Sequence, residues 1–331
     1  MAQRVSGDAS IFSKFNIDAS KSLDYNEFRL LCCELFDANV VEQRETSIRA
    51  IFKLFDADAD GVLNEQEIQR CCDWIRTTIN PVNILIIVDV QNDFIDGTLS
   101  LRKYNKNITE HNITEMIDSI NVLLQKVRWD KVIYTQDWHP ENHISFFENL
   151  PLRELDPESQ VTKDNAKLFD TVVFLEPRVK QTLWPKHCVK NTWGADLHKD
   201  LLILPSSERL YKGCQPDKDV YSGFNEKDAD GSSVLARLLP DVTVAHLYVC
   251  GIAYDVCVKE TCLDGLRLGY RLAVIDDCCR GIKPDDITIA KQLISENGGL
   301  ITTSKHVFSL VNDGNHSLVT AHHAAKMHYA R

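Results

Sequence analysis

Cys257 is a candidate nucleophile because of its place in the sequence. It lies in the segment VCGIAYDVCV (249–258), where an apolar, β-branched run breaks at Gly251 and changes to a helical pattern over 256–269. A cysteine in the first turn of a helix faces unpaired N–H groups and the positive end of the helix dipole. Both favour the thiolate, which is the nucleophilic form. A buried structural cysteine is the alternative, so Cys257 needs partners.

Two further side chains follow strand-like segments. Asp93 belongs to VDVQNDF, three residues past an apolar run, and Lys212 follows a short strand-like stretch in ERLYKGCQPD. Ligands of open α/β sheets gather at the carboxyl ends of the strands. An acid, a lysine and a cysteine there predict a cysteine amidohydrolase, in which the lysine stabilises the thiolate and the acid carries a proton to the leaving amine. A helix-capping Asp93 and a surface Lys212 are the alternatives.

A second constellation combines one aspartate with histidines. Asp137 and His139 are two residues apart in TQDWHPENHISF, and His187 lies in WPKHCV. One carboxylate and two imidazoles form an open ligand set for a metal, with positions left for water or substrate. His143 is a fourth candidate, which we expect to lie behind the ligands. Ordinary surface residues are the alternative interpretation.

The segment 56–67, DADADGVLNEQE, has the spacing of an EF-hand calcium loop. Calcium is a hard cation that takes roughly six to eight oxygen ligands, and the loop offers them at positions 1, 3, 5, 7 and 12. These positions are Asp56, Asp58, Asp60, Val62 through its carbonyl, and Glu67. Helical patterns flank the loop on both sides. An acidic, solvated turn is the alternative.

An upstream partner is expected because EF-hands usually occur in pairs. Residues 16–27 have the right length, but Lys21 occupies position 6, where a residue other than glycine is disfavoured at positive φ. We therefore predict a structural partner with weak or absent calcium binding. Leu23 and Leu63 occupy position 8 of the two loops, and we expect them to pair in a short β-bridge.

The chain divides near Pro81 into two parts of different character. Residues 1–80 have helical patterns and no clear strand, which predicts a small all-α domain. Residues 81–331 alternate strand-like runs with helical patterns, which predicts an α/β domain of three layers with a parallel sheet between helices. The strand-like runs are 84–90, 131–137, 201–205, 242–252 and 270–277, and the helical patterns include 113–128, 232–239 and 285–297.

Composition argues against several classes of protein. The net charge of −11 argues against nucleic-acid binding, which normally uses a basic face. The 11 cysteines do not have the pattern of a secreted disulfide framework. We see no apolar core of a signal peptide and no run of membrane-spanning length. We therefore expect a soluble, intracellular protein, cytoplasmic or nuclear, without nucleic-acid or membrane partners.

The motifs VDVQNDF, QDWHPENHISF, WPKHCV, LYKG and GIAYDVCV, in this order, resemble those of the nicotinamidases of the isochorismatase-like hydrolase family. The resemblance covers residues 84–280 and includes the metal set, which separates nicotinamidases from metal-free relatives. The EF-hand pair in front resembles that of the insect-type animal enzymes. The resemblance implies hydrolysis of nicotinamide to nicotinic acid and ammonia in NAD salvage, and it leaves open whether the chain forms a homo-oligomer.

The resemblance also implies catalytic roles. Asp93, Lys212 and Cys257 would form the triad, with a thioester on Cys257 as the intermediate. The family carries a cis peptide before the residue that matches Ala253, so the Ile252–Ala253 bond would be cis. The N–H groups of Ala253 and Cys257 would then stabilise the oxyanion.

The metal and the substrate complete the implied site. Zinc would be held by Asp137, His139 and His187 and would take the pyridine nitrogen at its open position, so that the metal selects the substrate and does not generate the nucleophile. The candidate substrate-binding side chains are Phe94, Trp138, His143 and Trp184, with Tyr221 and Phe224 as further candidates for the walls.

Two other functions are compatible with these motifs. The same fold could act on another small amide or an isochorismate-type ether, although the complete metal set argues against this. A calcium-binding adaptor with an inactive hydrolase domain is the second, and the intact triad argues against it. Calcium is expected to order the small domain. Regulation of activity by calcium is a hypothesis, with a constitutive stabilising site as its alternative.

Overall fold

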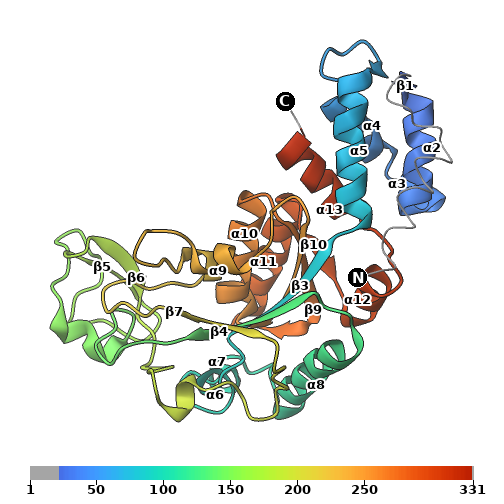
Figure 1. Cartoon of the computed structure of the whole chain (residues 1–331). Coiled ribbons are helices and arrows are strands. Elements are labelled where there is room, and N and C mark those ends of the chain that lie inside the picture. The colour runs from blue at the N-terminus through green and yellow to red at the C-terminus, as the bar shows by residue number, and fades with distance from the viewer. Residues whose placement is uncertain (1–21, 330–331) are drawn as a thin grey trace.

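The computed structural model of the chain describes residues 22–329. Its buried apolar side chains form two large groups. One covers both faces of a six-stranded sheet, and the other lies in an N-terminal helical lobe (Figure 1).

The six-stranded sheet is parallel throughout, with the strand order β10-β9-β8-β3-β4-β7. Its strands are β3 (Val82–Val88), β4 (Lys131–Asp137), β7 (Glu208–Lys212), β8 (Ala245–Ile252), β9 (Arg271–Arg280) and β10 (Leu300–Thr302). The central strands are mostly apolar because both of their faces are buried, and their polar residues Asn83 and His246 lie near the strand starts. The predicted parallel sheet is confirmed.

Helices cover the two faces of this sheet. On one face lie α6 (Asn92–Ile95), α7 (Leu101–Tyr104) and α8 (Glu110–Lys126), and on the other lie α9 (Val234–Leu238), α10 (Lys259–Arg267) and α11 (Pro284–Glu296) (Figure 1). A further helix, α12 (Ser304–Val311), contacts α8. No helix in the described part of the chain is long and apolar enough to cross a membrane.

One predicted strand is wrong. The apolar run 201–205 is an irregular segment, and the strand follows it as β7. Side chains rather than a neighbouring strand satisfy the backbone of Leu202, because Asn121 Oδ1 accepts from its N–H at 2.8 Å and the Tyr134 hydroxyl donates to its carbonyl at 2.8 Å. The apolar residues of this segment pack against the core, but its backbone does not pair with a neighbouring strand.

The N-terminal lobe contains α2 (Tyr25–Phe36), α3 (Ala38–Gln43), α4 (Glu45–Phe55) and α5 (Glu65–Ile79). Two short strands, β1 (Leu23–Asp24) and β2 (Val62–Leu63), join its loops. The predicted bridge is present, because Leu23 pairs with Leu63. Residues 16–21 of the upstream loop lie outside the described residues.

The C-terminal segment is part of the core of the lobe. Leu318, Ala321 and Ala325, on and just after α13 (Leu318–Ala324), are buried in this core. Trp74 Nε1 donates to the carbonyl of Ala321 at 2.9 Å. The end of the chain therefore packs against the helical lobe, although the sequence pattern groups it with the α/β part.

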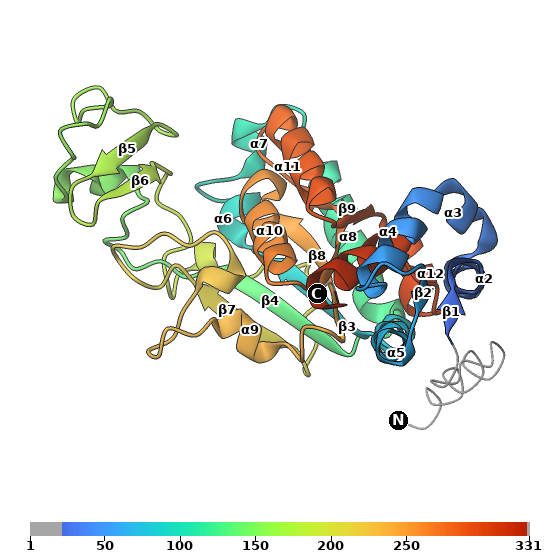
Figure 2. The same cartoon turned by 90° about the horizontal axis from the view of Figure 1, so that it is seen from above.

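A β-hairpin projects from the end of the molecule opposite the lobe (Figure 2). It consists of β5 (Thr171–Phe174) and β6 (Val179–Thr182) and has a small core of its own. Trp184 lies two residues after the end of β6, which connects the hairpin to the site described below.

Candidate active site

The register of the parallel sheet brings polar residues to one edge. Asp137 and Lys212 are the last residues of β4 and β7 and lie opposite each other. Val88, the last residue of β3, pairs with Thr135 on one side and Gly251 on the other. The segments that follow these strands therefore meet at the carboxyl edge, where ligands of open α/β sheets bind.

Lys212 is the centre of a buried group at this edge. Its Nζ lies 2.9 Å from Asp89 Oδ2 and 3.4 Å from Cys257 Sγ, and it donates to Asp137 Oδ1. Thr135 Oγ1 donates to Asp89 Oδ1 at 2.6 Å. An acid, a lysine and a cysteine are thus in contact, but the acid is Asp89.

The structure corrects the prediction for Asp93. Its carboxylate accepts hydrogen bonds from Cys188 N at 2.7 Å and Thr98 N at 3.0 Å. Neither of its oxygens bonds to Lys212 or Cys257. Asp93 therefore ties together two loops, one of which carries the neighbour of His187.

The reason lies in where β3 ends. The strand stops at Val88, so Asp89 is the first residue past the carboxyl edge, whereas Asp93 already belongs to the first turn of α6. Asp89 has a positive φ of 50°, a conformation that aspartate tolerates better than most residues. The position of Asp89 directly after a buried apolar run was the signal in the sequence that could have identified it as the acid beside Lys212.

Cys257 lies in a π-helical turn, Tyr254–Val258, that joins β8 to α10. It is 5% exposed and borders a cavity. Burial raises the pKa of its thiol well above the usual value, and the Lys212 ammonium opposes this only in part. Burial and the Lys212 ammonium thus act on the thiol in opposite directions.

The charges around Cys257 affect the pKa values of Asp89 and Lys212 differently. Burial raises the pKa of Asp89, against the effect of Lys212. Burial alone would lower the pKa of Lys212, but the carboxylates of Asp137 and Asp89 hold it well above its usual value. Lys212 therefore keeps its proton, and Asp89 is the group that can exchange one with the thiol.

Asp137, His139 and His187 bring one ligand atom each within 4.8 Å of one another. Nδ1 of His139 is 2.9 Å from the carbonyl of Gly213, and Nδ1 of His187 is 2.7 Å from that of Pro185. A carbonyl only accepts, so both Nδ1 atoms carry the proton and both Nε2 atoms offer a lone pair. Nε2 of His139 lies 3.6 Å and that of His187 3.8 Å from Asp137 Oδ2. This set fits a zinc-type metal.

His143 lies behind this set. Its ring stacks on His139 with the centroids 4.0 Å apart. Nδ1 lies 2.7 Å from Ser145 Oγ, and Nε2 lies 3.1 Å from the Lys218 carbonyl. His143 is absent from the described lining of the cavity, so its assignment to the substrate is corrected and it supports His139 instead.

The cavity beside Cys257 has mostly apolar walls and one polar end. Its walls include Phe94, Trp184, Tyr221, Val256 and Ile282, and its polar end includes Asp137, His187 and Asp219. Trp184 Nε1 donates to the Tyr221 hydroxyl at 3.1 Å, which fixes two aromatic walls relative to each other.

Two predicted wall residues lie outside this cavity. Trp138 packs on Tyr211 with ring centroids 4.6 Å apart, and Phe224 packs on Tyr270 at 5.5 Å. The alternation of side chains explains Trp138, since it directly follows Asp137 and points away from it. The predictions for these two residues are corrected.

The turn before Cys257 is also held in place. The Ile252–Ala253 peptide bond is cis, and Ala253 lines the cavity. The carboxylate of Asp255 accepts from the N–H groups of Ile282 and Lys283, each at 2.9 Å. Asp255 thereby anchors the turn to the segment before α11, a role that the sequence analysis missed.

Gln91 is a second residue that the sequence analysis missed. Its Nε2 donates to the carbonyl of Asp137 at 2.9 Å, and its Oε1 accepts from the N–H of Asp137 at 2.8 Å. Both hydrogen bonds fix the backbone at the end of β4. Its presence two residues after Asp89 in VDVQNDF was the available signal.

The loop 56–67 forms a separate acidic group in the N-terminal lobe. Asp56, Asp58 and Glu67 place carboxylate oxygens within 4.8 Å of one another. Asp60 Oδ1 accepts from the N–H of Val62 at 2.9 Å. One oxygen of Asp56, Oδ1, is buried and accepts no hydrogen bond. This orphaned oxygen fits a cation in the loop.

Comparison with known proteins identifies the α/β part. Residues 83–306 match the isochorismatase domain. The nicotinamidase of Escherichia coli strain K12 is 34% identical over 226 residues, which are 67% of this chain and 95% of that protein. A solved nicotinamidase/pyrazinamidase from Acinetobacter baumannii has a TM-score of 0.55 and 33% identity, over 69% of this chain and 98% of that one. The structure of yeast nicotinamidase bound to the inhibitor nicotinaldehyde has a TM-score of 0.53 and 29% identity, over 67% of this chain and 99% of that one. The chain belongs to the isochorismatase family.

Proposed function

We propose that this protein is a nicotinamidase that hydrolyses nicotinamide to nicotinate and ammonia and so returns the pyridine to NAD synthesis. The observation that carries the proposal is the cavity at the sheet edge, which Cys257, Asp137 and His187 line together. Directly behind Cys257, Lys212 contacts its thiol and the carboxylate of Asp89. A nucleophile, a proton carrier and a metal-type ligand set around aromatic walls suit a flat heteroaromatic amide.

Asp89 moves the protons in the proposed reaction. Sγ of Cys257 bonds to the carboxamide carbon while its proton passes to Asp89. The protonated Asp89 then gives this proton to the amide nitrogen, the C–N bond breaks, and ammonia leaves a thioester behind. Water attacks the thioester as Asp89 takes a proton from it. The C–S bond breaks, the proton returns to Cys257, and the nicotinic acid that forms loses its own proton to water as nicotinate.

Two further groups stabilise the charges of this sequence. The ammonium of Lys212 lies beside both Asp89 and Cys257, so it favours the transient thiolate. The N–H groups of Ala253 and Cys257 are our candidates for the oxyanion donors. Both belong to the turn that the Asp255 carboxylate anchors.

We infer that zinc is the metal held by Asp137, His139 and His187. The preference follows from one carboxylate and two imidazoles whose Nδ1 protons are fixed by carbonyls. A bound zinc ion supplies a Lewis-acid contact for the pyridine nitrogen. Phe94 and Trp184 bound the ring from the sides, and the walls exclude bulk water from the carboxamide.

The test is ammonia release by the zinc-loaded full chain. We expect turnover of nicotinamide and a loss of about 10⁴-fold or more in Cys257→Ala. Cys33→Ala, a cysteine of the N-terminal lobe, is the matched control and keeps full activity. Benzamide, which lacks the ring nitrogen, is expected to react at least roughly tenfold more slowly. An inactive wild type, or an active Cys257→Ala, would overturn the proposal.

We also infer that the loop 56–67 is an EF-hand calcium site. The clustered carboxylates of Asp56, Asp58 and Glu67 and the orphaned oxygen of Asp56 support this. The pairing of Leu23 with Leu63 supports an upstream partner loop. The role of calcium is first to order the lobe. An effect on turnover is a separate hypothesis, which equal rates with calcium and with a chelator would exclude.

A further inference from the structure

A small buried cavity lies near the N-terminal lobe, at the edge of the sheet away from the catalytic site. It is bordered by Thr78 and Pro81 at the end of α5, by His246 and Arg271 near the starts of β8 and β9, and by the segment 315–321. The described residues that line it include no acidic side chain. Its charged lining residue is therefore a cation, Arg271.

Arg271 is a buried cation without a carboxylate partner in the described part of the chain. It is 2% exposed, and burial lowers its pKa to about 10, so it stays charged at neutral pH. Its terminal N–H groups donate to the carbonyl and the hydroxyl of Thr77 in the last turn of α5. That helix end contributes only about half a negative charge. Nε of Arg271 makes no hydrogen bond, and a buried cation of this kind requires a counter-charge.

His246 adds a second free donor. It lies opposite Arg271 in the register of β8 and β9 and is 6% exposed. Nδ1 is 3.3 Å from the hydroxyl of Tyr248. Which of the two atoms donates depends on the tautomer, and the proposal below uses the tautomer in which the hydroxyl donates to Nδ1 and Nε2 carries the proton. Nε2 makes no hydrogen bond either.

We propose that this cavity binds one small inorganic anion of the size of chloride, held by Arg271 Nε and His246 Nε2. The anion balances the charge of Arg271 and accepts from both free N–H groups. It also joins three elements, since the lining comes from α5, the sheet and the segment 315–321. Binding of chloride therefore stabilises the docking of the N-terminal lobe on the sheet. A water molecule would accept the same hydrogen bonds but would leave the charge unbalanced.

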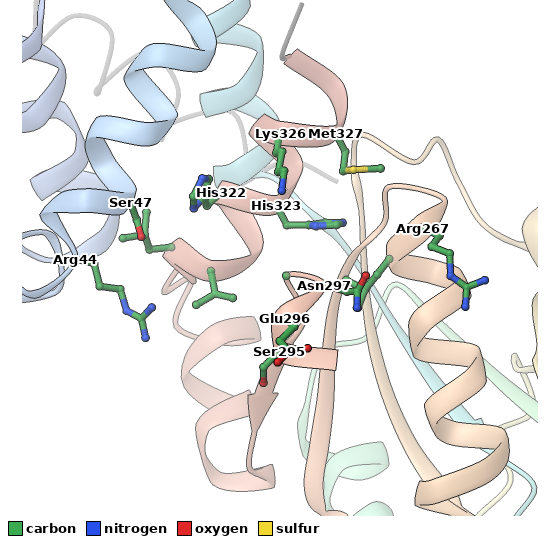
Figure 3. A pocket seen from close by; sticks show the side chains of 14 residues that line it. Arg44, Ser47, Arg267, Ser295, Glu296, Asn297, His322, His323, Lys326 and Met327 are labelled. Carbon is green, nitrogen blue, oxygen red and sulfur yellow. The ribbon is translucent and has the colours of Figure 1, made fainter. Parts of the chain in front are cut away.

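The C-terminal segment also borders a wider cavity of about 490 Å³, which provides a control. Arg44, His322 and Lys326 project around it, together with Glu296 (Figure 3). Lys326 is exposed to solvent, so water rather than a bound ion compensates its charge. Lys326 is thus a cation of the same region without a need for a buried counter-ion.

The first test is thermal unfolding of the full chain in chloride and in gluconate at equal ionic strength. We expect Tm to rise by about 2 °C for each tenfold increase in chloride above Kd. Arg271→Met removes the buried cation, and its Tm should no longer depend on chloride. Lys326→Met should keep the dependence of the wild type. A chloride effect that persists in Arg271→Met would be a general salt effect and would overturn the proposal.

The second test needs no variant, so it holds even if Arg271→Met does not fold. Crystals of the wild type grown in bromide should show an anomalous peak between Arg271 Nε and His246 Nε2. Density without an anomalous signal would mean that water fills the cavity, and the proposal would then be wrong. Neither readout depends on turnover, so failure here is separate from failure of the proposed nicotinamidase activity.

Discussion

The buried group at the sheet edge and the loop 56–67 both use carboxylates, but they are built in opposite ways. Asp89, Lys212 and Cys257 come from three separate segments, the outer two of which are more than 160 residues apart, and Asp89 and Lys212 are fully buried. The loop takes its carboxylates from twelve consecutive residues, and most of it is exposed. One group depends on the packing of the whole sheet, whereas the other is largely local.

This difference decides how large the effect of a single substitution is. In the buried group each charge is compensated by another buried charge of opposite sign, so removal of one leaves its partner uncompensated. In the loop, water can replace a lost oxygen ligand or a lost ion pair. We therefore expect large and coupled effects at the sheet edge and small, local effects in the lobe.

The largest effect tests which aspartate belongs to the buried group. Asp89→Asn should lower kcat/KM by about 10³-fold, because the amide cannot take the proton of Cys257. Asp93→Asn should lower it by less than roughly tenfold and should instead reduce the free energy of unfolding by about 1–3 kcal/mol, since one hydrogen bond to Cys188 N is lost. Ammonia release and urea unfolding of both variants provide the comparison. A larger kinetic loss in Asp93→Asn would contradict the assignment of Asp89.

The two regions also differ in how far the sequence could predict them. In the lobe the position of each residue in the loop defines its place, and the pairing of Leu23 with Leu63 follows from the same spacing. At the sheet edge, residue types predicted which side chains meet, and the structure does bring Lys212 to Cys257. The choice between Asp89 and Asp93 depended on where β3 ends and α6 begins, and an apolar run alone does not define these boundaries.

The wrong strand at 201–205 has a similar physical cause. An apolar run reports burial, and burial is shared by strands and by irregular segments. Only the tertiary partners of Leu202, the side chains of Asn121 and Tyr134, distinguish the two. The same holds for Trp138, which has the residue type of a pocket wall but, directly after β4, packs on Tyr211 outside the cavity.

The next effect is on stability. Lys212→Met leaves the carboxylates of Asp89 and Asp137 buried without their cation, so we expect the free energy of unfolding to fall by about 3–5 kcal/mol. The exposed pair between Lys186 and Glu141 is the matched control, and Lys186→Met should cost less than about 1 kcal/mol. Urea unfolding measures both. Equal losses would show that burial does not separate the two pairs.

A smaller effect is expected in the calcium loop. Glu67→Gln keeps an oxygen acceptor for only one of the N–H groups of Ala57 and Asn64, and it removes one negative charge. Calcium affinity should therefore fall roughly tenfold or more while the lobe stays folded. Calorimetric titration with calcium measures the affinity, and ammonia release at saturating zinc should be unchanged. If Glu67→Gln bound calcium as tightly as the wild type, the loop 56–67 would not be the calcium site.

The smallest effect compares the two tryptophans near the sheet edge. Trp184 lines the cavity and donates to the hydroxyl of Tyr221, so Trp184→Phe removes both contact area and that hydrogen bond. We expect KM for nicotinamide to rise roughly fivefold, the equivalent of about 1 kcal/mol. Trp138 packs on Tyr211 outside the cavity, and Trp138→Phe should leave KM within about twofold. Because both substitutions make the same change of side chain, only the position relative to Cys257 differs between them. A larger rise of KM in Trp138→Phe would mean that the substrate reaches beyond the cavity, toward the outer side of β7.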